Sequence, residues 1–255
     1  MLRTRVSIAV IASLALIGAC SSDDSSSSTT VETTTVTTPP DTTLPDTVAP
    51  TTLPDTTLPE TTLPDTTLPT EMQMAIWPTT DVVFTTPEAA AADFLAAVFG
   101  EGPLLGDFMA GDSRSGEIEV FASVDGAPIG EPRSVLMMRQ LGPSDGWFVL
   151  AASSVQTITT PAPLATVPAG LLSVEGLGTG FEATIIVSAF LAGNAAGEFD
   201  REVTMAGNFG ESLPYSVQLD LTTATSGDVV VLMIVGGTGL ETDPGDFSAF
   251  PILIG

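Results

Sequence analysis

A short repeat between residues 42 and 70 sets the strongest limit on what this chain folds into. Each unit places a proline in the same position, and proline blocks a helix interior and removes donors from a β-ladder. The apolar content of the region is too low to offset the entropy lost on ordering. We therefore expect residues 20–73 to form a disordered Thr/Pro/Asp-rich stalk and folded structure only in residues 74–255. The repeats are TTLPD at 42–46, 51–55 and 61–65, TTLPE at 56–60 and TTLPT at 66–70.

The stalk is long enough to display a folded part away from a surface. A segment of about 50 residues spans roughly 40 Å as a coil and at most ~160 Å as polyproline II. Either length lifts a domain off a membrane and into or through a cell wall. The density of Thr and Pro is also typical of O-glycosylated stalks, and an unmodified spacer is the alternative.

The first 20 residues are typical of an export leader. Arg3 and Arg5 precede an almost entirely apolar segment, residues 6–19, which is short for a membrane span but right for a signal peptide. The segment closes on Ile-Gly-Ala-Cys at 17–20, which resembles the lipobox of bacterial lipoproteins. The resemblance implies a signal peptide over 1–19, a lipidated Cys20 and a lipid anchor on the extracytoplasmic face of the cell membrane. An ordinary secretory signal with a chance cysteine is the alternative.

The charged residues exclude several classes of function. The formal net charge is -25, and a surface this acidic repels phosphate, so we expect no nucleic-acid partner. All six basic residues are arginine, and the chain has no histidine. Ser-His-Asp triads, histidine-ligated metals, Schiff-base lysines and P-loop chemistry are therefore excluded, and we expect no cofactor. Cys20 is the only cysteine, so the folded part must rely on an apolar core rather than on disulfides.

Residues 74–160 read as a small α+β module. Thr86 is a suitable N-cap, Pro87 a suitable first helical residue, and Gly100 a suitable stop. Between them, apolar residues recur at helical spacing, which predicts one short amphipathic helix. Strand signals follow at 117–124, 134–141 and 147–153. One helix and an antiparallel meander are expected.

Residues 161–255 read as an all-β sandwich. Alternating or continuous apolar runs recur between clusters of Gly, Pro, Asn and Asp. In the longest run, Phe181, Ala183 and Ile185 begin one face of a predicted strand. The run at 229–235 is continuously apolar, as in a central strand. The glycines of Gly176-x-Gly178-x-Gly180 are expected to shape a turn rather than a dinucleotide loop. The predicted strands are 171–175, 181–191, 199–205, 215–221, 229–235 and 250–254.

Two segments carry a resemblance to a known family. The sequence VEGLGTGFEAT at 174–184 resembles the signature of the immunoglobulin-like domain of bacterial spore germination, as does Pro214-Tyr215-Ser216, with Tyr where Phe is usual. The resemblance covers about 161–255 and implies an extracytoplasmic β-sandwich that acts as an interaction module without known catalytic residues. Residues 74–160 do not look like the companion module of germination proteins. They are more similar to the small domain that precedes this sandwich in secreted actinobacterial lipoproteins, so a germination role does not transfer.

Several acidic residues are candidates for chemistry. Glu117 and Glu119 share one strand face, and a carboxylate pair for glycoside hydrolysis would instead converge from different segments. Glu241, Asp243 and Asp246 crowd one loop, where oxygen ligands would suit Ca²⁺, although loop acids without a recognised spacing are usually just solvated.

Other motifs have simpler interpretations. Gly111-Asp112-Ser113 is like the nucleophile block of GDS-type esterases, but the histidine that such enzymes need is absent. Trp147 lies in a predicted strand and is expected in the core, whereas Trp77 precedes a proline near the edge of the folded part and would suit either a core or a ligand surface.

Together these features predict a non-catalytic cell-envelope lipoprotein. Its folded part would be a surface binding or adhesion module for cell-wall glycan or for an envelope protein, tethered to the membrane through its lipid. Two alternatives stay open. One is a carboxylate-dependent glycan hydrolase, and the other is a purely structural envelope spacer.

Overall fold

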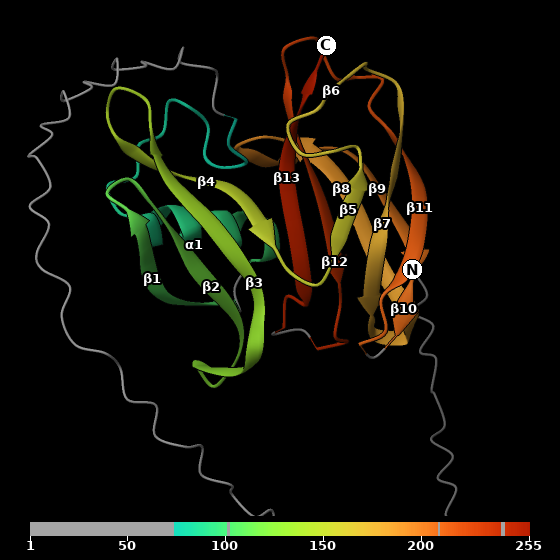
Figure 1. Cartoon of the computed structure of the whole chain (residues 1–255), viewed down its shortest axis with the longest axis horizontal. Helices are drawn as coiled ribbons and strands as arrows, with labels where there is room; N and C mark the ends of the chain where they lie inside the picture. The colour runs from blue at the N-terminus through green and yellow to red at the C-terminus, as the bar shows by residue number, and fades with distance from the viewer. Residues whose placement is uncertain (1–73, 101–102, 209, 241–242) are drawn as a thin grey trace, which may run out of the picture. The chain divides into compact units, whose positions relative to one another are not determined.

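The computed structural model describes residues 74–100, 103–208, 210–240 and 243–255 (Figure 1). All of them fall within one compact unit of the chain. The leader, the stalk and Cys20 lie outside the described residues, as does Glu241. The described part is mostly antiparallel β-sheet with one α-helix, in a sandwich-like arrangement.

Helix α1 spans Pro87–Phe99 and begins and ends as predicted. Thr86 accepts a hydrogen bond from the backbone N–H of Ala89 at 3.2 Å, so it is the N-cap. Gly100 ends the helix with a positive φ of 74°, which favours glycine. Phe94 is fully buried on the face that meets the sheet.

The strands extend or add to those that the sequence predicts. The strand Leu104–Asp112 was not predicted, and neither were the short strands at 157–160, 166–167 and 207–208. The strands of the described part are β1 (Leu104–Asp112), β2 (Ser115–Val124), β3 (Ala127–Leu141), β4 (Gly146–Ser153), β5 (Thr157–Thr160), β6 (Thr166–Val167), β7 (Leu171–Gly180), β8 (Thr184–Leu191), β9 (Asn194–Met205), β10 (Gly207–Asn208), β11 (Leu213–Asp220), β12 (Val229–Gly236) and β13 (Asp246–Ile254).

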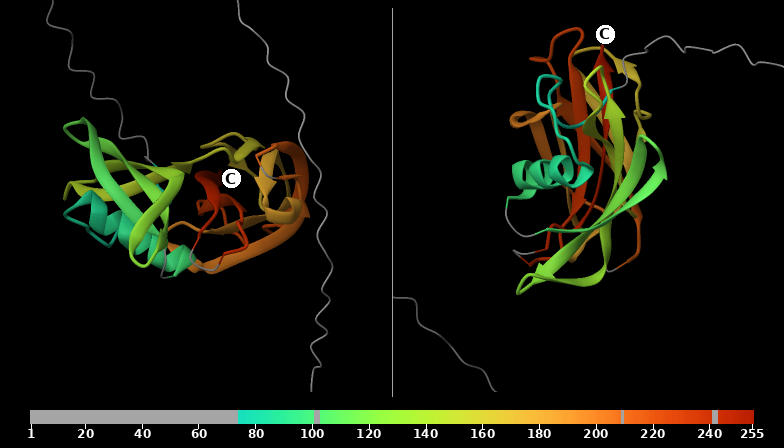
Figure 2. Two further views of the ribbon diagram at one scale, coloured as in Figure 1. Left: turned by 90° about the horizontal axis from the view of Figure 1, so that it is seen from below. Right: turned by 90° about the vertical axis from the view of Figure 1, so that its left-hand side faces the viewer.

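Two sheets organise these strands. In the described residues, a nine-stranded sheet has the order β1-β2-β3-β4-β13-β12-β8-β9, with β6 also pairing to β13. A four-stranded sheet has the order β10-β7-β11, with β5 also pairing to β7. Helix α1 lies against one face of the large sheet, which Figure 2 shows in its right-hand view. The small sheet packs on the opposite face.

Strand β12 is apolar throughout because both of its faces are covered. Val231 and Met233 belong to the core under α1, whereas Leu232 and Ile234 belong to the core between the two sheets. A strand buried on both sides loses the alternation of a half-exposed strand. The sequence prediction of a central strand at 229–235 is therefore confirmed.

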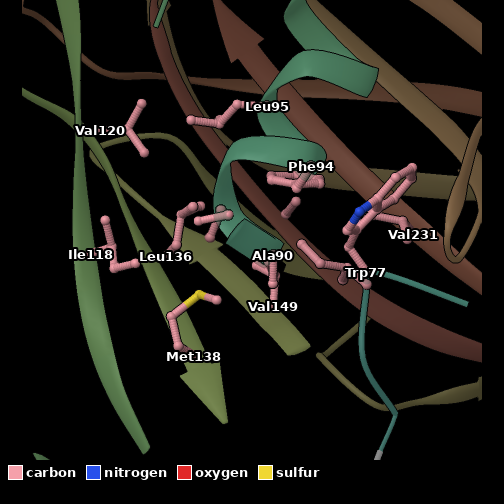
Figure 3. Close-up of a cluster of buried hydrophobic side chains, with 14 of the residues drawn as sticks. Trp77, Ala90, Phe94, Leu95, Ile118, Val120, Leu136, Met138, Val149 and Val231 are labelled. Carbon is pink, nitrogen blue, oxygen red and sulfur yellow. The ribbon is translucent and has the colours of Figure 1, made fainter. Parts of the chain in front are cut away.

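The core under α1 gathers side chains from β2, β3, β4 and β12 (Figure 3). Trp77 is buried there, with its ring centroid 6.1 Å from that of Phe94, and its indole N–H donates to a carboxylate oxygen of Asp93 at 2.8 Å. Trp147 is also buried, as expected. Both tryptophans serve the core rather than a ligand surface.

The regions 74–160 and 161–255 share one sheet. Strand β4 pairs with β13 through Ala152 and Ala249, and both residues lie in the core under α1. Residues 157–160, at the end of the first predicted module, form β5 and pair with β7 in the small sheet. The predicted boundary at 160/161 thus separates two regions of different sequence pattern whose strands pair with each other in both sheets.

Two local predictions are wrong. The long strand predicted from Phe181 begins only at Thr184, because Phe181–Ala183 form a turn in which Glu182 and Ala183 have φ values of 53° and 60°. The glycines at 176, 178 and 180 do not shape a turn but lie within β7. Gly176 is needed there because a Cβ atom would lie 1.9 Å from the carbonyl oxygen of Thr157.

Candidate functional site

A cavity of about 390 Å³ lies where β3 meets the ends of β7 and β12 and the start of β13. These ends lie at the same end of the sheets, the lower one in Figure 1. The volume is within the range of small-ligand sites, about 300–1,000 Å³. We call this cavity the Arg133 groove; its walls include Arg133, Thr179, Phe181, Gly237, Thr238 and Asp246.

A buried glutamine fixes one wall of the Arg133 groove. Gln156 is 1% exposed, and its side-chain amide donates to the carbonyl oxygen of Thr179 and accepts from the Thr179 N–H at 3.0 Å. Gly236 allows this close approach, since a Cβ atom there would lie 2.1 Å from the Gln156 amide nitrogen. The end of β7 is therefore held in place before any ligand arrives.

Phe181 presents an aromatic ring to the groove. Its backbone N–H donates to the carbonyl oxygen of Gly237 at 2.8 Å, which ties the turn after β7 to the end of β12. The side chain is 43% exposed and packs near Gly239. The two residues after it have the left-handed φ values given above, and non-glycine residues adopt these at a cost in free energy. Such backbone strain is typical of functional sites.

An arginine shared by two carboxylates supplies the charge of the groove. The Nε and Nη2 atoms of Arg133 donate to the two carboxylate oxygens of Asp243 at 3.0 and 2.7 Å. The Asp243 side chain is only 2% exposed, and it also accepts the Gly245 N–H at 3.0 Å. Asp243 is thus fully engaged by a bidentate, charge-assisted pair.

Asp246 is compensated less well than Asp243. Its Oδ1 lies 3.7 Å from Nη1 of Arg133, which is beyond ordinary hydrogen-bond length. Burial raises the pKa of the Asp246 carboxyl above its usual value, the nearby Asp243 charge adds to this, and Arg133 opposes both. The side chain is 27% exposed and lines the groove.

One hydroxyl on the groove wall lacks a partner. In the described part of the chain, Thr238 Oγ1 is the one buried side-chain oxygen or nitrogen without a hydrogen bond. A buried polar group in this state costs free energy, so its position at the groove calls for an explanation.

The acidic loop that suggested Ca²⁺ is arranged differently from a metal site. Both oxygens of Asp243 point to Arg133, and Asp246 faces the same guanidinium. Glu241 lies outside the described residues. Across the residues that the structure describes, no group of three or more His, Cys, Asp or Glu side chains is placed to hold a metal ion.

The other sequence candidates lie apart from the groove. Gly111-Asp112-Ser113 is at the hairpin between β1 and β2, where Asp112 accepts the Arg114 N–H at 2.7 Å. Glu117 and Glu119 share the outward-facing side of β2, as expected. Sequence reasoning missed Arg133 and Thr238 as site residues, because neither belongs to a local motif. Phe181 lies in the family-like segment at 174–184, but the sequence analysis placed it in a strand and not at a site.

A second, smaller cavity of about 220 Å³ lies between the end of α1 and the large sheet. Its walls mix the apolar side chains of Phe99, Ile186, Met233 and Val235 with the polar or charged ones of Ser188, Arg201 and Asp243. The Arg133 groove is the larger of these two cavities, and Phe181 on its wall has an exposed aromatic ring.

Comparison of the chain with protein-family models, with curated proteins and with solved structures found no match. No helix among the described residues is long and apolar enough to cross a bilayer. The geometry of the groove is therefore the main guide to function.

Proposed function

We propose that this chain is a non-catalytic lipoprotein of the bacterial envelope that binds cell-wall glycan through the Arg133 groove. The observation that carries the proposal is the groove itself: a preformed cavity that combines an exposed aromatic ring, hydroxyls and a charged pair. Ligand sites in proteins commonly combine apolar or aromatic walls with a few fixed polar groups. An envelope protein as the partner is the alternative occupant.

The carboxylates of the groove favour binding over hydrolysis. A glycan hydrolase of the usual kind needs two free carboxyl groups, one on each side of the scissile bond. Asp243 is occupied by Arg133 and by the Gly245 N–H, so the groove offers one carboxyl, that of Asp246. The absence of histidine and lysine from the whole sequence removes the common alternatives for general-base or nucleophilic catalysis.

The leader and the stalk supply the location. The lipobox-like segment supports lipidation of Cys20, and the Thr/Pro repeats support display of the folded part at a distance from the membrane. The likeness of residues 161–255 to the immunoglobulin-like domain of spore germination supports an interaction role, but a role in germination is not proposed. If Cys20 is the anchor, Cys20→Ser moves the protein from the membrane fraction to the soluble fraction.

Retention on purified cell walls tests the proposal. Gly237 has open space around its Cα and no positive φ, so Gly237→Trp fills the groove without backbone strain. Ser144→Trp, in the exposed turn between β3 and β4, controls for an added surface aromatic. We expect the full chain in detergent and Ser144→Trp to be retained, and Gly237→Trp to be lost.

Three results would count against this proposal. Equal retention of all three proteins would move the binding site away from the groove. Release of reducing ends from wall polymers by the full chain would favour the hydrolase instead. Retention of none of them on walls, with capture of an envelope protein, would favour the alternative partner.

A further inference from the structure

Among the described residues, the walls of the Arg133 groove carry one cation, Arg133, and one carboxylate, Asp246. Asp243 is not one of these wall residues, but it takes the two short contacts to the Arg133 guanidinium, so the three charged groups together hold one more negative than positive charge. Asp246 is left with a contact of 3.7 Å and carries a charge that Arg133 compensates only in part. A carboxylate held in a partly desolvated cavity gains most from a cationic hydrogen-bond donor.

Two further features of the walls suit a donor of this kind. The exposed ring of Phe181 lies on the same groove, and aromatic faces attract ammonium groups. Thr238 Oγ1, the one buried side-chain oxygen or nitrogen without a hydrogen bond in the described residues, belongs to another wall residue, and its hydroxyl can accept a hydrogen bond from an ammonium group.

The charge of the whole chain also favours a cationic ligand. The formal net charge is -25, and a protein of high net charge raises the local concentration of ligands of the opposite sign. An anionic glycan would be repelled by the Asp246 carboxylate and would find the Arg133 guanidinium already paired with Asp243. A neutral glycan would leave the charge of Asp246 only partly compensated.

We propose that the Arg133 groove recognises an amino-sugar unit with a free, protonated amine, whose ammonium pairs with the Asp246 carboxylate beside the ring of Phe181. This rests on the proposed function and names its ligand class. The ammonium donates to the carboxylate, and the sugar ring lies along the glycine-rich and hydroxyl-bearing walls. Asp246 is then a binding residue, and Arg133 and Asp243 are positioning residues.

Two probes that differ only in the amine test this proposal. Oligomers of glucosamine and of N-acetylglucosamine of equal length are titrated calorimetrically into the full chain in detergent. At about pH 6 a free amino-sugar amine is protonated and an ordinary carboxyl is ionised. We expect the free-amine oligomer to bind at least about tenfold more tightly, because a charge-assisted bond replaces a neutral one.

Variants assign the preference to Asp246. Asp246→Asn keeps the shape of the side chain and removes its charge, so the two oligomers should then bind within about threefold of each other. Asp145→Asn removes an exposed carboxylate that pairs with Arg114 elsewhere, and should keep the tenfold preference. If Asp246→Asn does not fold, the preference of the unaltered chain should still weaken as salt is raised.

The outcomes separate this inference from the proposed function. If the acetylated oligomer binds as tightly as the free-amine one, or if Asp246→Asn keeps the preference, the ligand class is wrong while glycan binding stands. If neither oligomer binds but cell walls still retain the chain, the ligand class is again wrong. If a preference persists unchanged in high salt, the pairing of charges is overturned.

Discussion

At the scale of single residues, the two carboxylates near Arg133 are paired with its guanidinium to different degrees. Asp243 is buried with both oxygens bonded, whereas Asp246 is half-buried and only loosely paired. A partly buried carboxylate of this kind lowers the free energy of unfolding of the ligand-free protein, since its charge is not fully compensated until a cationic ligand binds. Stability and binding should therefore respond in opposite directions when Asp246 is changed.

Asp246→Asn should stabilise the protein at neutral pH. Folding raises the pKa of Asp246, so the protonated carboxyl stabilises the folded state. This contribution to the free energy of unfolding is present at low pH and is lost as the pH rises through the folded pKa. Removing the charge should raise the free energy of unfolding at neutral pH by at most about 1 kcal/mol, because the group is partly exposed. Denaturant unfolding at neutral pH and at a pH below the ordinary value for Asp measures this. The gain should vanish at the lower pH, and a loss of stability at neutral pH would show that the Asp246 charge does not destabilise the folded state.

Arg133→Met should be strongly destabilising. It leaves the buried Asp243 carboxylate with one backbone N–H as its remaining donor, and removing one partner of a buried pair costs about 3 kcal/mol or more. Arg114→Met is the matched control, because the Arg114–Asp145 pair is exposed and should contribute about 1 kcal/mol or less. Equal effects of the two substitutions in denaturant unfolding would show that Asp243 does not depend on Arg133.

At the scale of elements, local sequence patterns predicted the helix and most strands. These patterns failed where long-range contacts determine whether a segment forms a strand or a turn. Thr86, Pro87 and Gly100 act within one turn of α1, so the sequence alone placed its ends. Strand β1 was missed because its residues are mainly exposed and lack an apolar alternation. The alternation of apolar and polar residues that begins at Phe181 predicts one continuous strand. The structure has a turn there instead, because Glu182 and Ala183 have positive φ values.

Gly176→Ala should weaken the small sheet. The added Cβ would lie 1.9 Å from the carbonyl oxygen of Thr157, so β5 has to move away from β7. That carbonyl also accepts the hydroxyl of Tyr215 at 3.1 Å, and burial raises the pKa of this phenol. We expect a loss of about 1–3 kcal/mol in the free energy of unfolding. Gly111→Ala is the control, since its nearest neighbour would be 3.6 Å away, and a loss of similar size there would contradict this reason.

At the scale of the whole folded part, one large sheet joins regions that the sequence separates. Ala152 and Ala249, which pair in the large sheet, are almost a hundred residues apart in the sequence, and no local pattern predicts their pairing. The groove depends on the same long-range arrangement, because Arg133 comes from β3 and Asp246 from β13. The sequence did mark Asp243 and Asp246, but as Ca²⁺ candidates, since their partner lies far away in the chain.

The folded part should unfold as one cooperative unit. A fragment of residues 161–255 leaves Phe190, Val231 and Phe247 without the core under α1, and it lacks β5. We expect residues 74–255 to show a single thermal transition and residues 161–255 alone to show none. A cooperative transition in the shorter fragment would mean that the sandwich folds independently of the helix and β1–β4.

A chemical-shift map of the folded part, titrated with soluble cell-wall glycan fragments, tests directly whether glycan binds in the Arg133 groove. We expect the largest shifts on the backbone amides of Phe181, Gly237 and Asp246, and we expect these shifts to disappear in Gly237→Trp but to persist in Ser144→Trp. Shifts centred on Ile186 and Val235 at the smaller cavity, or no shifts at saturating fragment, would contradict this expectation.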